Sequence, residues 1–347
     1  MFFLLIISAD EKRLGMHITA IQKFIRDHPS AKADHLTTSQ LNSKFIKPET
    51  KGTLQSYIHK YVDLQDETTG VPLVSTATVF VSHAWRYSFY DVVVDVMEQY
   101  AREFPDAYFW FDLFTNNQNE VSNKDFDWFC TTFRNGVRDI GQVLLALSPW
   151  NDPMPIKRAW CLLEIHNALQ ETKVDLSIYL PEGEVQQLTA GVMEGFQSVV
   201  QALSDIQAEK AEAKTISDRN MIFEVIRNSD GGFLDVNKRV KNELRSWYIK
   251  QLKALADLEP ENHLLLGRTG GIIDAFGGLD EALVYYNNAL DVQLKVLDQG
   301  KMVSGENSAA TYYNNIGLVY LKKGDFEIAL DHLTKALPTG QNQSAES

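Results

Sequence analysis

The 347-residue sequence has few cysteines, no excess of positive charge and no long apolar run, and each shortage removes a class of protein. Two cysteines, Cys130 and Cys161, are too few for a disulfide framework, which makes a reducing cytoplasm the expected compartment. The formal charge of -13 repels nucleic acid and anionic membranes at long range, so neither is an expected partner. The opening run MFFLLIIS is far shorter than the roughly 20 apolar residues that span a bilayer. We expect it to begin a buried strand or helix, with a poor signal peptide as the alternative.

The sequence also lacks the motifs of common nucleotide, metal and hydrolase sites. It contains no GxxxxGK[ST] phosphate loop, no GxGxxG turn after a strand, no HExxH pair and no GxSxG elbow. Its eight histidines are scattered without metal-ligand spacing, and its two distant cysteines cannot make a zinc site. We therefore expect no bound metal and no resident cofactor.

Apolar periodicity divides the chain into four segments. Residues 1–70 show broken helical periodicity and are expected to form a helical lead-in of unknown role. Residues 71–183 alternate amphipathic helices with the short apolar runs ATVFVS, YFWFDLF, QVLLALS and VDLSIYL. That alternation predicts an α/β fold with a parallel sheet covered by helices on both faces. Residues 184–259 are expected to form a helical extension, and residues 260–340 a set of helical hairpins.

The last segment repeats itself. GGLDEALVYYNNAL and GDFEIALDHLTKAL superimpose with a shift of 47 residues, which pairs Gly270 with Gly317 where a small residue lets two helices cross closely. The second unit, AATYYNNIGLVYLKKGDFEIALDHLTKAL, resembles a tetratricopeptide repeat of the longer kind found in kinesin light chains. The resemblance implies binding of peptides or helices from other proteins, with Tyr312, Asn315 and Tyr320 as candidate contacts. Two units are fewer than the roughly three that a free solenoid needs, so either the array is shortened or it leans on the helices before it.

The α/β segment resembles a Toll/interleukin-1 receptor (TIR) domain in the order of its motifs. TVFVSHAW is similar to the first strand and Ser-His-Ala loop of that family, while YFWFDLF and VLLALSPW stand where its second and third strands end, here in Asp112 and Ser148. RAWCLLEI resembles the family's Trp-Cys-x-x-Glu helix. The resemblance implies a flavodoxin-like parallel sheet. Two departures indicate a modified back half: Lys157 stands where many members have a serine, and no last strand is visible after VDLSIYL.

Trp160, Glu164 and Asn167 share one face of the predicted helix, because residues three and four apart lie about 6 Å from one another. Open α/β sheets bind ligands at the carboxyl edge of their strands, where we expect this face to lie. In TIR enzymes that cleave NAD the glutamate of this motif is catalytic, so the resemblance assigns that role to Glu164, with NAD as substrate. The other candidate substrate contacts lie at strand ends or on the same helix: Ser82, His83, Trp85, Asp112, Trp160 and Asn167. The simpler alternative is that Trp160 and its neighbours only pack the helix on the sheet.

Two functions stay open at this stage. In the first, the protein is a cytoplasmic signalling or scaffold protein in which the TIR-like domain and the tetratricopeptide repeats mediate protein–protein assembly, with homo-oligomers forming through the TIR-like domain. In the second, it is an NAD glycohydrolase that uses Glu164 and is activated by oligomerisation. The two differ in whether the carboxylate does chemistry or only belongs to the fold.

Overall fold

The structure is a computed structural model that describes most of the chain, in the ranges 13–121, 124–195, 197–204, 206–298 and 309–337. The buried start expected at residues 1–8 lies outside these ranges. The chain forms two compact units, which are treated separately: the α/β unit, Met1–Val185 with Ile206–Val240, and the repeat unit, Gln186–Asp205 with Lys241–Ser347. No helix within the described ranges is both long and apolar enough to cross a lipid bilayer.

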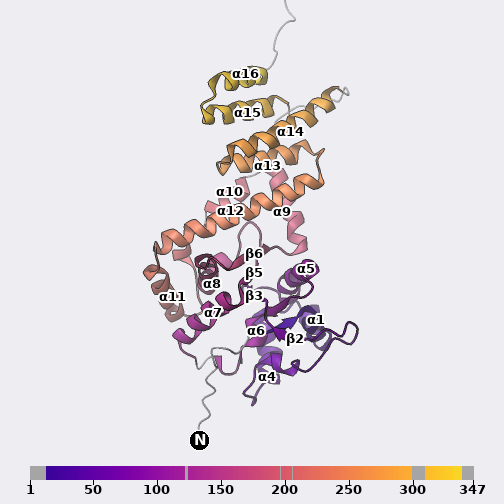
Figure 1. Cartoon of the computed structure of the whole chain (residues 1–347), viewed down its shortest axis with the longest axis vertical. Helices are drawn as coiled ribbons and strands as arrows, with labels where there is room; N and C mark the ends of the chain where they lie inside the picture. Colours follow the sequence, from indigo (N-terminus) through magenta and orange to yellow (C-terminus); the bar gives the residue numbers. More distant parts are fainter. Residues whose placement is uncertain (1–12, 122–123, 196, 205, 299–308, 338–347) are drawn as a thin grey trace, which may run out of the picture. The chain divides into compact units, whose positions relative to one another are not determined.

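A sheet forms the centre of the α/β unit (Figure 1). It has six strands in the order β2-β1-β4-β3-β5-β6. Its strands are β1 (Leu14–His17), β2 (Val74–Thr76), β3 (Val79–Ser82), β4 (Tyr108–Trp110), β5 (Gln142–Ala146) and β6 (Asp175–Tyr179). Strands β4, β3, β5 and β6 run parallel, whereas β1 is antiparallel to both of its neighbours. Numbered among themselves, the parallel strands follow the order 2-1-3-4, which is compatible with a flavodoxin-like sheet without its fifth strand. The predicted α/β class is confirmed.

The antiparallel strand β1 comes from the segment that was expected to be a helical lead-in. Gly15 in its centre lies so close to both neighbours that an added Cβ would be 2.8 Å from the carbonyl carbon of Tyr108 and 2.9 Å from the Cα of Ala77. Only glycine fits such an approach without moving backbone. The expectation of an entirely parallel sheet is therefore wrong at this edge. The strand LGMH shows no alternation by which it could be recognised in sequence, because Gly15, Met16 and His17 are all buried.

Helices cover both faces of the sheet, as expected. Because side chains alternate along a strand, Val79 and Val81 of β3 join one apolar cluster, while Phe80 joins another with Trp110 and Phe133. The second cluster lies under α7 and α8, so Ser82, two residues after Phe80, points to that same side. The helices of this unit are α1 (Ile18–Asp27), α2 (Ser30–Ala33), α3 (Thr38–Leu41), the π-helix η1 (Asn42–Ile46), α4 (Lys47–Glu49), η2 (Tyr57–Lys60), the π-helix η3 (Phe89–Val94), α5 (Asp95–Glu103), α6 (Asp112–Thr115), α7 (Phe126–Ile140), η5 (Pro155–Lys157), α8 (Ala159–Gln170), η6 (Ala208–Lys210) and α11 (Ile216–Asn228).

Helices are the only regular elements of the repeat unit within its described residues. Two helical hairpins, α13 with α14 and α15 with α16, occupy the segment in which the sequence repeats. Glycines allow the close crossings that the repeat predicted, because an added Cβ would lie 3.0 Å from the Tyr286 ring at Gly270 and 2.7 Å from the Leu333 side chain at Gly317. The hairpin helices are α13 (His263–Ala275), α14 (Leu279–Asp298), α15 (Ala309–Lys323) and α16 (Phe326–Ala336). The remaining helices are α9 (Glu182–Glu194), α10 (Gln197–Ser204) and α12 (Gly232–Leu258), and of these α9 and α12 begin in the α/β unit.

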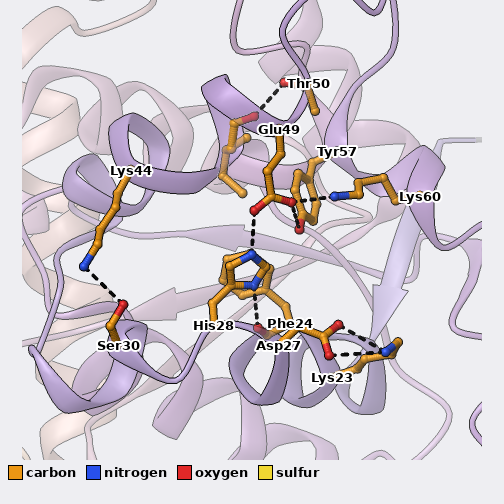
Figure 2. A network of polar contacts seen from close by, with 11 residues as sticks. Lys23, Phe24, Asp27, His28, Ser30, Lys44, Glu49, Thr50, Tyr57 and Lys60 are labelled. Carbon is orange, nitrogen blue, oxygen red and sulfur yellow. Dashed lines mark hydrogen bonds and ion pairs between the residues drawn. The ribbon is translucent and has the colours of Figure 1, made fainter.

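A polar network around Glu49 joins the short helices of the lead-in (Figure 2). The Glu49 carboxylate lies 2.6 Å from Nε2 of His28 and accepts hydrogen bonds from the Tyr57 hydroxyl at 2.9 Å and the Lys60 ammonium at 2.5 Å. Nδ1 of His28 lies 2.9 Å from the carbonyl oxygen of Phe24, so both ring nitrogens of His28 contact oxygen atoms. Burial opposes ionisation of Glu49, but the bonds from Lys60, His28 and Tyr57 outweigh it and lower the pKa of Glu49 below 4.5.

We expect Glu49→Gln to destabilise the protein by about 1–3 kcal/mol at neutral pH, because it weakens three charge-assisted hydrogen bonds at once. Because the pKa of Glu49 is lower in the folded than in the unfolded state, its carboxylate stabilises the fold above the unfolded pKa. This stabilisation is lost as pH falls through the folded pKa, so the difference in stability between wild type and Glu49→Gln should shrink in acid. Urea denaturation at several pH values measures this difference. The exposed Glu67→Gln is the matched control, and equal stability of the two variants at neutral pH would contradict the role of the network.

Candidate functional site

Five sequence-predicted residues lie together at the carboxyl end of the parallel strands, and we call them the strand-end cluster. Ser82 is the last residue of β3 and His83 follows it, Trp85 lies in the loop beyond, and Asp112 begins α6 two residues after β4. Glu164 comes from the second turn of α8. Strand β3 pairs with β4 on one side and with β5 on the other, so the strand order reverses between β3 and β5. Such a switch of strand order is where ligands of open α/β sheets bind.

The Glu164 carboxyl group is held inside this cluster. The Ser82 hydroxyl donates a hydrogen bond to Oε2 of Glu164 at 2.5 Å, and only 8% of Glu164 is exposed to solvent. Burial raises the pKa of Glu164 to about 8, an effect that the Ser82 bond opposes and the nearby Asp112 carboxylate adds to. Glu164 is therefore mostly protonated at neutral pH.

Asp112 is the second carboxyl group of the cluster. The indole N–H of Trp85 donates to Oδ2 of Asp112 at 2.9 Å, whereas Oδ1 is buried without a hydrogen-bond partner. Burial raises the pKa of Asp112 to about 6, and the hydrogen bonds from Trp85 and from the backbone of Leu113 act in the opposite direction. Two carboxyl groups with pKa values spread between 6 and 8 can exist as one neutral and one charged group near pH 7.

His83 completes the buried part of the cluster. Its ring lies 4.7 Å from that of Phe111, and burial lowers the pKa of the imidazole to about 3, so the ring is neutral. Nε2 of His83 is buried and has no hydrogen-bond partner. The thiol of Cys161 donates to the His83 carbonyl oxygen at 3.3 Å, which ties α8 to the end of β3. Nε2 of His83 and Oδ1 of Asp112 are thus two buried polar atoms that a bound polar group can satisfy.

Two residues of the predicted helix stripe are used in packing. The Trp160 ring lies 5.5–6.0 Å from three phenylalanine rings of α7, those of Phe126, Phe129 and Phe133. Asn167 is buried within α8. Lys157, at the position where the TIR family often has serine, pairs with Asp152. The structure therefore joins Glu164 with Ser82 and Asp112 with Trp85, and it places the Trp160 indole among the apolar side chains of α7.

Sequence reasoning missed a neighbouring contact, in which Glu184 reaches the end of β5. The Ser148 hydroxyl donates to the Glu184 carboxylate, which also accepts the backbone N–H of Trp150 at 2.7 Å. The hydroxyl of Tyr87 donates to the Ser148 carbonyl oxygen and accepts its backbone N–H. A serine at a strand end was visible in the sequence, but its acidic partner follows 36 residues later. Among the described residues, no group of three or more His, Cys, Asp and Glu side chains is placed to hold a metal ion.

The repeat unit carries a second candidate site, a hollow of about 330 Å³ that we call the repeat groove. It is lined by residues of α13, α14 and α15: Leu264, Gly267, Arg268, Gly271, Asp274, Ala275, Tyr286, Thr311, Tyr312, Asn315 and Lys322. Two of the three predicted contacts, Tyr312 and Asn315, belong to this lining. The third, Tyr320, stacks on His332 instead, with ring centroids 5.7 Å apart.

Charge and shape distinguish the repeat groove from an ordinary surface hollow. Lys322 forms an ion pair with Asp274 at 2.6 Å, but Arg268 has no acidic partner within the described parts of the chain, and its Nε is buried without a hydrogen bond. Tyr312 is fixed by its hydroxyl, which donates to the His263 carbonyl oxygen at 3.0 Å. Gly267 permits this position, since an added Cβ would lie 2.5 Å from the Tyr312 ring. The groove therefore has a rigid aromatic wall and an uncompensated positive charge.

The raised pKa of Glu164 predicts how stability changes with pH. The folded state prefers the protonated carboxyl group of Glu164. The contribution of this preference to the stability of the fold is complete below an unfolded pKa near 4.5 and is lost as pH rises to about 8. In Glu164→Gln the glutamine side chain is uncharged at every pH and keeps the shape of the glutamate. We expect wild type to lose on the order of a few kcal/mol more stability than Glu164→Gln between about pH 5 and 8. Denaturant titration at each pH measures this loss. The control Glu171→Gln, at the end of α8, should behave as wild type. Parallel stability profiles for all three proteins would refute the raised pKa of Glu164.

Comparison with known proteins adds no family to these observations. No protein-family model matches the chain. No curated protein matches its sequence at a significant level. The α/β fold and the helical repeat unit are established by the structure, while the TIR-like and tetratricopeptide-like resemblances serve as hypotheses about what the two candidate sites do.

Proposed function

We propose that this protein is a cytoplasmic signalling scaffold in which tetratricopeptide-like repeats hold a segment of a partner protein and the TIR-like α/β unit mediates further assembly. The observation that carries the proposal is the repeat groove, where Arg268 offers a cation with no acidic partner among the described residues. A hollow of about 330 Å³ accommodates a few side chains of a bound peptide. The association of α/β units with one another rests on the TIR-like order of their motifs.

The lining of the repeat groove defines the chemistry of the segment that it binds. The planar guanidinium of Arg268 matches a carboxylate, to which it can donate two parallel hydrogen bonds. The amide of Asn315 and the hydroxyl of Thr311 add neutral donors, and the rings of Tyr286 and Tyr312 add apolar faces. We therefore infer that the partner supplies a short segment that carries a carboxylate beside an apolar side chain.

Binding of labelled peptides tests this function. We expect a short peptide rich in Asp and Glu, with one aromatic residue, to bind the full chain more tightly than the same peptide with Asn and Gln in place of the acids. Arg268→Gln should weaken binding of the acidic peptide at least tenfold, which corresponds to about 1.4 kcal/mol. Lys295→Gln removes a positive charge from the exposed side of α14, outside the groove, and should leave affinity unchanged. Equal affinities for the two peptides, or equal effects of the two substitutions, would rule the groove out as a carboxylate site.

A second candidate function is NAD cleavage in the strand-end cluster, which the convergence of Ser82, Asp112 and Glu164 favours. Breaking the bond between ribose and nicotinamide leaves a positive charge on the sugar, while nicotinamide departs as a neutral molecule. Water then adds to the ribose and releases a proton to solvent. An ionised carboxylate beside the sugar lowers this barrier by several kcal/mol. Glu164 supplies such a carboxylate once it loses its proton, and the Ser82 hydroxyl holds it in position.

We expect artificially clustered protein to release nicotinamide from NAD if this second function operates. Glu164→Gln should abolish release and Glu171→Gln should retain it. Since the pKa of Glu164 is raised to about 8 and the ionised form is the active one, the rate should increase as pH rises from about 7 to 9. Chromatography of the reaction mixture measures nicotinamide. A rate equal to that of Glu164→Gln at every pH would leave the scaffold function alone.

A further inference from the structure

Asp112 is a carboxyl group of the strand-end cluster to which the cleavage step described above gives no task. Strands β3 and β4 pair Phe80 with Trp110. Two residues further along each chain, Ser82 and Asp112 therefore reach the same level at the carboxyl edge of the sheet. Ser82 holds the Glu164 carboxyl group, and the charge of Asp112 contributes to the raised pKa of Glu164. The two carboxyl groups thus belong to one site.

One oxygen of the Asp112 carboxyl group is fixed and the other is unused. Oδ2 accepts the indole N–H of Trp85 at 2.9 Å, whereas Oδ1 is buried without a hydrogen-bond partner. The backbone is fixed as well, because the side-chain amide of Gln118 donates to the Asp112 carbonyl oxygen at 2.7 Å. The Asn42 amide of η1 donates in turn to Oε1 of Gln118 at 3.4 Å. A carboxylate oriented in this way, with one oxygen unused, is prepared to accept a proton from a bound molecule.

The helical lead-in, whose role the sequence does not show, supports this arrangement. The backbone N–H groups of Thr38 and Ser39 in α3 donate to the carbonyl oxygens of Tyr87 and Trp85, each at 3.1 Å. These bonds hold the loop from which the Trp85 indole reaches Asp112. The lead-in thus contacts both segments that position this carboxyl group, the loop after β3 and the loop after α6.

Packing alone does not explain a carboxyl group at this position. The hydrogen bonds that Asp112 accepts come from the Trp85 indole and the backbone N–H of Leu113, and neither donor carries a charge. An asparagine accepts the same bonds without the cost of burying a carboxylate. Burial raises the pKa of Asp112 to about 6 and that of Glu164 to about 8, so Asp112 is the more readily ionised of the two near pH 7.

We propose that Asp112 is the general base of the strand-end cluster and takes a proton from the water that attacks the ribose. The assignment rests on the second candidate function, the cleavage of NAD. After nicotinamide has left, the water oxygen forms a bond to the anomeric carbon of the ribose cation. One O–H bond of the water breaks, and its proton passes to Oδ1 of Asp112 and from there to solvent. Glu164 stabilises the cation, so the two carboxylates act in successive steps.

Competition between water and a second nucleophile for the ribose cation tests this assignment. Artificially clustered protein is incubated with NAD and an excess of acetylpyridine, a base that attacks without losing a proton. Because only water needs a general base, Asp112→Asn should raise the ratio of the exchanged dinucleotide to ADP-ribose at least tenfold. Asp106→Asn removes an exposed carboxylate from the turn before β4 and should leave the ratio unchanged. Chromatography measures both products.

The outcomes separate the assignment from the function on which it rests. An unchanged ratio in Asp112→Asn overturns the assignment although NAD is cleaved, and so does an equal loss of both products, which indicates a part in bond cleavage. If wild type releases no nicotinamide, the second candidate function fails and the assignment falls with it. Circular dichroism checks the fold of Asp112→Asn. Should it not fold, Trp85→Phe keeps the carboxylate but frees it, and a ratio equal to that of wild type overturns the assignment.

Discussion

The enclosure of α8 is the constraint on which the α/β unit depends. Nine of its twelve residues are buried, and it lies against β3, β6, α7 and α11. A helix enclosed in this way has no route by which a charged side chain can reach water. Burying an unpaired carboxylate costs several kcal/mol, so Glu164 is retained only with a proton and a hydrogen-bond partner. Ser82 provides that partner because the alternation along β3 directs it to the same side as Phe80.

This enclosure also bears on the two proposed functions. A carboxyl group that serves as an electrostatic catalyst must ionise, and in the closed cluster the folded state favours the neutral form. A positively charged pyridinium bound beside it would reverse that preference by lowering the pKa of Glu164. Near neutral pH, ionisation of Glu164 would thus depend on substrate entry. The repeat groove requires no such rearrangement, since Arg268 is charged and its aromatic wall is already in place, and this is why the scaffold function stands first.

The sequence predicted the regular elements better than the contacts between them. The boundaries of α7 and α8 and the parallel strands β3 to β6 follow from apolar runs and helical periodicity within single segments. Strand β1 does not, because LGMH acquires its conformation from the two neighbouring strands and from the absence of a side chain at Gly15. Glu164 was singled out by its motif, yet its bond to Ser82 joins residues 82 positions apart. That Arg268 has no acidic partner among the described residues is likewise a property of the folded helices and has no local signal.

The acidic surface of the whole chain and the single positive charge of Arg268 act over different distances. Together they would restrict the partners that the proposed site in the repeat groove can bind. Ions screen charges beyond about 8–10 Å at physiological salt, so the acidic surface as a whole acts only on what comes near. A large acidic protein would bring many like charges within that distance and would be repelled. A short carboxylate-bearing segment brings one or two, and Arg268 faces them directly within the groove. The carboxylate site that we propose would therefore favour flexible acidic segments that extend from a neutral or basic partner over broad acidic surfaces.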